Sequence, residues 1–76
     1  MINEFDQVAL TIDLLEEGFV VGDVGTVVDI TTNGKGVTLE FFNFAGKTVA
    51  VVPMSIDDVR PLSSDEVVHA RAVKTA

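Results

Sequence analysis

The dipeptide Asn33-Gly34 limits the fold of this chain more than any other feature, because it lies between two runs rich in β-branched residues. Asn-Gly in this setting favours a two-residue type I′ turn between antiparallel strands. The predicted pairs are Thr32 with Lys35, Ile30 with Val37, Val28 with Leu39 and Thr26 with Phe41. The apolar partners fall on one face of this hairpin, so the turn and the hydrophobic pattern indicate the same register.

Three of the five phenylalanines lie within four residues, at the end of the second strand of this hairpin. The loop Phe44-Ala45-Gly46, with Gly46 in the left-handed conformation, is typical of a second hairpin closure. The predicted pairs are Asn43 with Lys47, Phe41 with Val49 and Leu39 with Val51. We therefore expect Phe41 to face the core, Phe42 to point to the opposite face, and Phe44 to lie on the turn.

The remaining segments complete an all-β domain. Alternation of apolar and polar residues over 7–13 predicts the first strand. Ser55 is the expected cap of a single helical turn, and residues 59–62 predict a last strand in which Pro61 requires an edge position. Five short strands with tight turns indicate a small, strongly bent barrel over residues 1–62.

Residues 63–76 are expected to form a C-terminal tail. Ser63 and Glu66 have the spacing of a capping box, which predicts a short helix over about residues 64–73. The apolar stripe of this segment is weak, and short isolated helices are marginal in water, so a disordered tail is the alternative.

The composition favours a binding protein over an enzyme. The 76 residues contain no cysteine and one histidine, so we expect no catalytic residues, no cofactor and no metal site. Residues 1–62 contain ten acidic and three basic residues, which gives the whole net charge of −7 and opposes binding to nucleic acid. The first residues lack a basic leader, and no apolar run reaches the ~18 residues of a membrane span, so a cytoplasmic location without a membrane partner is expected.

Several short motifs match the pattern of a known family. The matching residues are Gly22-Asp23, Gly25-Thr26-Val27-Val28, Glu40-Phe41, Gly46, Thr48, Ala50 and Arg60-Pro61. Over about residues 6–62 the chain resembles a family of small bacterial domains of unknown function. The resemblance implies an SH3-like barrel and brings no established catalytic residues. Relatives that lie beside small toxin-like genes would imply an antitoxin or immunity role.

This chain departs from the family pattern in ways that add apolar surface. Phe44 stands where the family usually has a polar residue, and Val20-Val21 stands where a basic or polar pair is common. Pro53 replaces a more usual strand residue. The two apolar departures strengthen the case for a docked partner.

The Gly-x-x-Gly-Thr-Val segment, residues 22–27, also resembles the KOW element of ribosomal and transcription proteins. That resemblance implies nucleic-acid binding, for which KOW domains carry basic loops. The matching loops here hold acidic residues, namely Glu16, Glu17, Asp23 and Asp29. A KOW-like nucleic-acid-binding domain is therefore the alternative function.

The segment DITTNGKGVTLE matches part of a calcium-loop pattern, with oxygen-bearing residues at the expected spacing. The flanking helices of such a loop are missing, and the same residues already predict a hairpin. We therefore expect no metal site, with weak cation binding by Asp29 and Glu40 left open.

The sequence favours a non-enzymatic protein-binding module, of the antitoxin, immunity or accessory-subunit type. Its docking surface would be an apolar patch with an acidic rim on the outward face of the sheet. The predicted interaction residues are Val20, Val27, Glu40, Phe42, Phe44 and Val52. The alternatives are that the patch forms a homodimer, or that Val67 and Val68 of the tail fold back and cover it.

Overall fold

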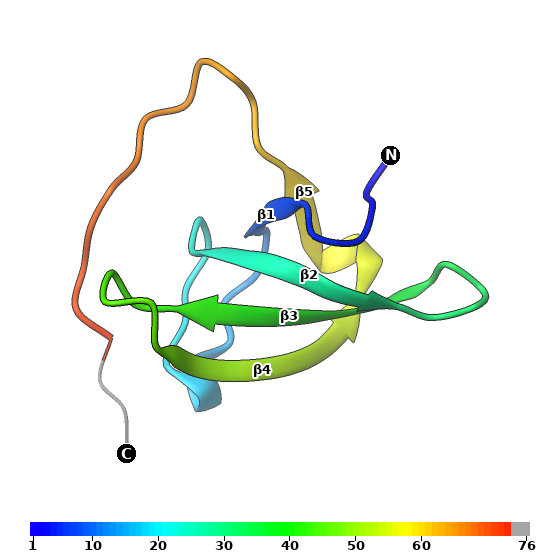
Figure 1. Ribbon diagram of the computed structural model, residues 1–76, viewed down its shortest axis with the longest axis horizontal. Helices are drawn as coiled ribbons and strands as arrows, with labels where there is room; N and C mark the ends of the chain where they lie inside the picture. Colours follow the sequence, from blue (N-terminus) through cyan, green and yellow to red (C-terminus); the bar gives the residue numbers. More distant parts are fainter. Residues whose placement is uncertain (74–76) are drawn as a thin grey trace.

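The computed structural model describes residues 1–73 and is all-β (Figure 1). One five-stranded antiparallel sheet has the order β4-β3-β2-β1-β5. The strands are β1 (Gln7–Leu10), β2 (Val24–Ile30), β3 (Gly36–Phe42), β4 (Thr48–Ser55) and β5 (Val59–Pro61), and the 3₁₀ turns are η1 (Leu15–Glu17) and η2 (Ile56–Asp58). Among residues 1–73 no helix is both long and apolar enough to cross a membrane.

The sheet is curved but not closed. Over the described residues β4 pairs with β3 alone and β5 pairs with β1 alone, so both are edge strands. Each edge carries a proline, Pro53 in β4 and Pro61 in β5. Proline has no N–H to donate to a further strand, which is why it is tolerated at an edge. The predicted edge position of Pro61 is confirmed, whereas a closed barrel is not.

The first hairpin differs from the predicted type I′ turn. Such a turn requires positive φ at both central residues, and here Gly34 has φ +73° while Asn33 does not. The loop is wider because Thr31 and Asn33 satisfy its backbone: the Thr31 hydroxyl accepts from the Gly36 N–H, and the Asn33 side-chain oxygen accepts from the Lys35 N–H, both at 2.9 Å. The prediction of a two-residue type I′ turn at Asn33-Gly34 was therefore wrong.

A β-bulge between Val27 and Asp29 then shifts the register of β2 against β3 by one residue. The predicted pairing of Ile30 with Val37 is confirmed on the turn side of the bulge. Beyond the bulge Leu39 lies opposite Val27 and not Val28, so the predicted pairs of Val28 and Thr26 were wrong.

The second hairpin closes as predicted, with one correction. Asn43 donates its N–H to the Lys47 carbonyl at 2.9 Å, and Gly46 has φ +83°. A second irregularity follows between Phe41 and Phe42, so that Phe41 lies opposite Ala50 and not Val49. The predicted pairing of Leu39 with Val51 was wrong in the same way, since Leu39 lies opposite Val52.

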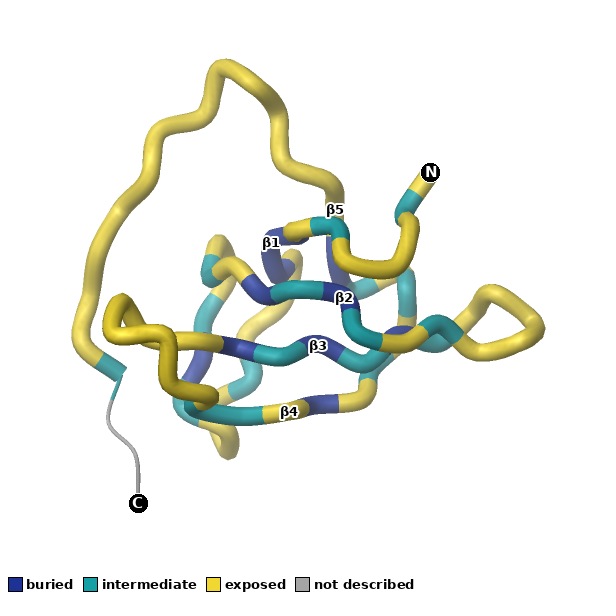
Figure 2. Tube along the Cα trace, in the orientation of Figure 1, coloured by how far each residue is buried: buried dark blue, intermediate teal, exposed yellow. Residues whose placement is uncertain are grey.

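The two shifts exchange neighbouring valines between core and surface. Val27 is 0% exposed and Val52 is 9% exposed, so both belong to the core, and their predicted place on the outward face was wrong. Val51, which was predicted to pair with Leu39 on the core face, is 56% exposed. The buried apolar residues are Val8, Leu10, Phe19, Val27, Val37, Leu39, Phe41, Val52 and Val59, and they form one cluster inside the curved sheet (Figure 2).

The three neighbouring phenylalanines are distributed as expected. Phe41 is buried, and its ring stacks on that of Phe19 with the centroids 4.0 Å apart. Phe42 lies opposite Thr48 and is 48% exposed, while Phe44 on the turn is fully exposed. The capped turn is also confirmed, because the Ser55 hydroxyl oxygen accepts from the Asp57 N–H.

The tail runs beside the sheet as an extended, mostly exposed segment (Figures 1 and 2). Residues 63–73 contain no helix, so the helix expected there is not found, and residues 74–76 of the predicted tail lie outside the described residues. The capping bond itself forms, since Glu66 accepts from the Ser63 N–H at 2.7 Å. A helix is not propagated because Val67 and Val68 are almost fully exposed and supply no packing.

Candidate functional site

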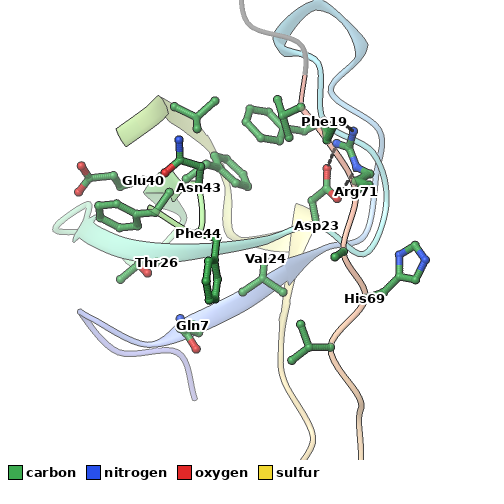
Figure 3. A pocket seen from close by; sticks show the side chains of 17 residues that line it. Gln7, Phe19, Asp23, Val24, Thr26, Glu40, Asn43, Phe44, His69 and Arg71 are labelled. Carbon is green, nitrogen blue, oxygen red and sulfur yellow. Dashed lines mark hydrogen bonds and ion pairs between the residues drawn. The ribbon is translucent and has the colours of Figure 1, made fainter. Parts of the chain in front are cut away.

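A groove lies between the tail and one end of the sheet (Figure 3). It has a volume of about 750 Å³. Its lining comes from strands β1 to β4, from the segment that precedes β2, from the turn after β3, and from residues 68–73 of the tail. The groove therefore joins two parts of the chain that are far apart in sequence.

The sheet side of the groove is apolar with an acidic border. Val24 and Phe42 are each nearly half exposed, and Phe44 extends fully into solvent from the turn. Glu40 borders these side chains and accepts a hydrogen bond from the Thr48 hydroxyl. An apolar centre with a polar rim is the usual composition of a protein interface.

Asp23 supplies a second carboxylate at the other end of the groove. A tight turn positions it: the Asp23 N–H donates to the Val20 carbonyl at 3.0 Å, and the Asp23 side chain accepts from the Val20 N–H at 2.9 Å. Gly22 has φ +92° within this turn, a conformation that a residue with a Cβ adopts only with strain. The local sequence thus holds the carboxylate facing the tail.

Arg71 of the tail points at this carboxylate (Figure 3). Its Nε donates to Asp23 Oδ1 at 2.9 Å, and its Nη2 donates to Asp23 Oδ2 and, at 3.0 Å, to the Gly18 carbonyl. Burial raises the pKa of Asp23, but the bonds from Arg71 and the Val20 N–H, together with the charge of Arg71, outweigh it and lower the pKa below its ordinary value.

A second ion pair holds the start of the tail. Arg60 in β5 donates two hydrogen bonds of 2.8 Å to the two carboxylate oxygens of Glu66. These bonds, with that from the Ser63 N–H, lower the pKa of Glu66 to about 2. Between Glu66 and Arg71 the tail is exposed, and the His69 ring points away from the sheet (Figure 3).

The structure brings together some of the predicted interaction residues and separates others. Glu40, Phe42 and Phe44 line the same groove. Val20 is half-buried and lines a neighbouring groove of about 630 Å³. The buried Val27 and Val52 cannot contact a partner from the core.

Three residues of the groove that matter for its chemistry were not predicted as site residues from the sequence. Val24 precedes the predicted second strand, and nothing in its position indicates exposure. Asp23 stands in a motif that the family pattern includes, which was the available signal. Arg71 lies 48 residues further along the chain, and no periodicity or spacing links it to Asp23.

Two alternatives from the sequence can be compared with these positions. Val67 and Val68 are 91% and 97% exposed, so they do not cover the apolar patch. The calcium-like segment forms the first hairpin, where the Asn33 oxygen accepts from the Thr31 hydroxyl and the Lys35 N–H. Among residues 1–73 no group of three or more His, Cys, Asp or Glu side chains is placed to hold a metal ion.

Comparison with known proteins identifies a family and nothing more specific. Neither the curated proteins nor the solved structures contain a match to this chain. A family model described as "Domain of unknown function (DUF4926)" matches residues 4–61. The matched region begins before β1, ends with β5 and leaves out the tail. Because the match spans most of the chain, this protein belongs to the DUF4926 family of domains of unknown function.

Proposed function

We propose that this chain is a non-enzymatic protein-binding module that docks a partner through Val24, Phe42 and Phe44, with Glu40 at the border. The observation that carries the proposal is the exposure of two neighbouring phenylalanine rings beside a groove. Phe42 is 48% exposed and Phe44 is fully exposed, although the domain has a core that buries Phe41 next to them. Exposed aromatic side chains are common anchors of protein interfaces.

An SH3-like barrel is the fold that we propose for the domain. The strand order β4-β3-β2-β1-β5 supports it, because the first and last strands become neighbours while the others follow as successive hairpins. The curvature of the sheet around a single apolar cluster also supports it (Figure 1). In this arrangement the groove lies at one end of the barrel, and the docked partner would face β2 and β3.

The charge of the domain favours a protein partner with a basic surface. Asp23 and Glu40 border the groove, and the net charge of the chain is −7. Nucleic acid would require cations to replace the counterions of its phosphates, and an acidic border opposes that. A basic partner instead would associate faster and with greater selectivity. An antitoxin, an immunity protein or an accessory subunit would fit this description.

The test is affinity purification of the tagged chain from its own host at physiological salt. We expect one stoichiometric partner with the wild type and its loss with Phe44→Ser. Phe44 packs against nothing in the core, so this change should alter the free energy of unfolding by no more than about 0.5 kcal/mol.

Leu15→Ser is the matched control. Leu15 in η1 is 74% exposed and lines neither groove, so its replacement removes a large exposed apolar side chain from another site. We expect Leu15→Ser to retain the partner. Recovery of the tagged chain alone, or of the same partner with Phe44→Ser, would contradict the proposed function.

A further inference from the structure

The end of the groove at Asp23 already holds a guanidinium group, and that group comes from the tail of the same chain. We propose that this end is a recognition site for an extended segment of the partner protein that carries an arginine followed two residues later by an aliphatic residue. In the structure Arg71 and Val73 of the tail occupy the site in place of that segment. The inference rests on the proposed function and names the chemistry of the partner.

The arginine position is defined by three acceptors. The two carboxylate oxygens of Asp23 and the carbonyl of Gly18 accept from Nε and Nη2 of Arg71. A guanidinium presents its donors in a rigid planar fork, and bonds of this kind to a carboxylate are stronger than neutral ones. Lysine, whose ammonium is a single point of charge, would not satisfy all three acceptors in the same way.

The aliphatic position lies next to the stacked rings. Val73 is half-buried, packs against the core cluster, and lines the groove together with Phe19 and Phe41. In an extended chain, residues two apart point to the same side. Arg71, which bonds to Asp23, and Val73, which packs against the core cluster, therefore face the domain together, and this sets the spacing that the site selects.

The tail is held weakly enough to be replaced. Val67 and Val68 are almost fully exposed, and no strand or helix forms over residues 63–73. The fixed points are the pairs Arg60–Glu66 and Arg71–Asp23, with Val73 beyond them. Solvent screens the more exposed Arg60–Glu66 pair, so the contacts that a partner segment must replace are those of Arg71 and Val73.

The acceptors of the site and the tail that now fills it differ in charge and in family membership. Residues 1–62 contain ten acidic and three basic residues, so a segment with an arginine is attracted to this domain. Gly18 and Asp23 lie within the region that matches the family, residues 4–61, whereas Arg71 lies outside it. The acceptors thus belong to the family domain, and the tail supplies the arginine that fills them.

The first experiment measures binding of a synthetic peptide to the full-length chain by NMR. The peptide VVHARAV copies residues 67–73, with both ends blocked, and VVHAQAV is its matched control. Arg71→Gln removes the guanidinium that occupies the site, and it changes no residue of the sheet. We expect millimolar VVHARAV to shift the amides of Gly18, Phe19 and Asp23 in Arg71→Gln, and to bind the wild type at least tenfold more weakly because the tail competes.

Two further variants separate recognition from structural damage. Asp23→Asn in the Arg71→Gln chain keeps an oxygen for the Val20 N–H but removes the charge, so we expect peptide binding to fall at least tenfold with the sheet amides unchanged. Arg71→Lys keeps the charge of the tail but not the fork, and should compete less well than the wild-type tail. Equal binding of VVHAQAV, no shifts at millimolar peptide, or full binding after Asp23→Asn would each overturn the inference.

The outcomes also distinguish this inference from the proposed function. Phe44→Ser should leave peptide shifts at Asp23 in place, because the arginine acceptors are Gly18 and Asp23. Absence of peptide binding, with a Phe44-dependent partner still captured, would overturn the recognition site alone. Peptide binding with no captured partner would contradict the proposed function alone.

Discussion

The sheet and the tail of this chain are held in place by different interactions. The sheet is held by antiparallel pairing of five strands around one buried apolar cluster. The tail, residues 63–73, is attached through two arginine–carboxylate pairs and the half-buried Val73. Burial stabilises the first in proportion to apolar area, whereas salt and pH act directly on the second. The sheet should therefore keep its structure under conditions that release the tail.

The largest expected effect comes from the core. Leu39 is 0% exposed and lies in the interior strand β3, so Leu39→Ala should lower the free energy of unfolding by about 2–5 kcal/mol. A domain of this length has about 4–11 kcal/mol in total, so chemical denaturation should detect the loss easily. Val67→Ala is the control from the tail and should change stability by less than about 0.5 kcal/mol. Similar losses for the two variants would break the comparison.

A smaller effect is expected where β2 approaches the stacked rings. Gly25 is buried, and a Cβ at this position would lie 3.1 Å from Cε1 of Phe41 and 3.3 Å from Cβ of Leu39. Gly25→Ala should therefore destabilise the sheet by about 1–3 kcal/mol through overpacking. Thermal unfolding measures the loss, and unchanged contacts of Arg71 with Asp23 would show that the tail is independent. An equal or higher melting temperature would contradict this prediction.

The smallest effect is expected from acid and should appear in the tail alone. The pKa of Glu66 is lowered from 4.5 to about 2, and that of Asp23 is lowered from 3.8, so both carboxylates are stabilised in the charged form. Their contribution is full above these ordinary values and is lost as the pH falls towards 2. NMR of residues 67–73 should show the tail released over this range before the sheet unfolds. Loss of both regions at one pH would contradict this order.

The sequence predicted local turn chemistry well at the second hairpin and at the cap of η2, but not at Asn33-Gly34, where the loop is wider than a type I′ turn. Gly46 was expected in the left-handed conformation and Ser55 as a cap, and both are confirmed. The distribution of Phe41, Phe42 and Phe44 followed from the turn at Asn43–Lys47, because the chain reverses within a few residues. Such features depend on neighbours in sequence, which is why they can be predicted from one chain.

The register beyond the turns could not be predicted, and the reason lies in paired valines. Alternation assigns a face only where apolar and polar residues take turns. Val27-Val28 and Val51-Val52 are apolar at both positions. After a shift of one residue an apolar side chain still faces the core, so the hydrophobic pattern does not distinguish the two registers. The irregularities at Val27/Asp29 and at Phe41/Phe42 therefore left no signal in the sequence, and they changed which valine of each pair faces the core.

The candidate site was predicted in part for a related reason. Phe42, Phe44 and Glu40 were found because a hairpin places them, whereas the contact of Arg71 with Asp23 joins two irregular segments. Phe19 was also missed as a core residue, since it reaches the ring of Phe41 from a loop without alternation. Contacts between loops depend on the completed fold and have no local pattern.

The prolines at the two open edges bear on how this protein behaves at high concentration. An open sheet can recruit strands from other copies and grow into fibrils. Pro53 and Pro61 interrupt that growth, because a strand added at either edge would lack a donor at the proline. The open sheet is thus protected from growth into amyloid by edge-to-edge pairing. Association of this domain with other chains should therefore use contacts between side chains and not backbone pairing at the edges.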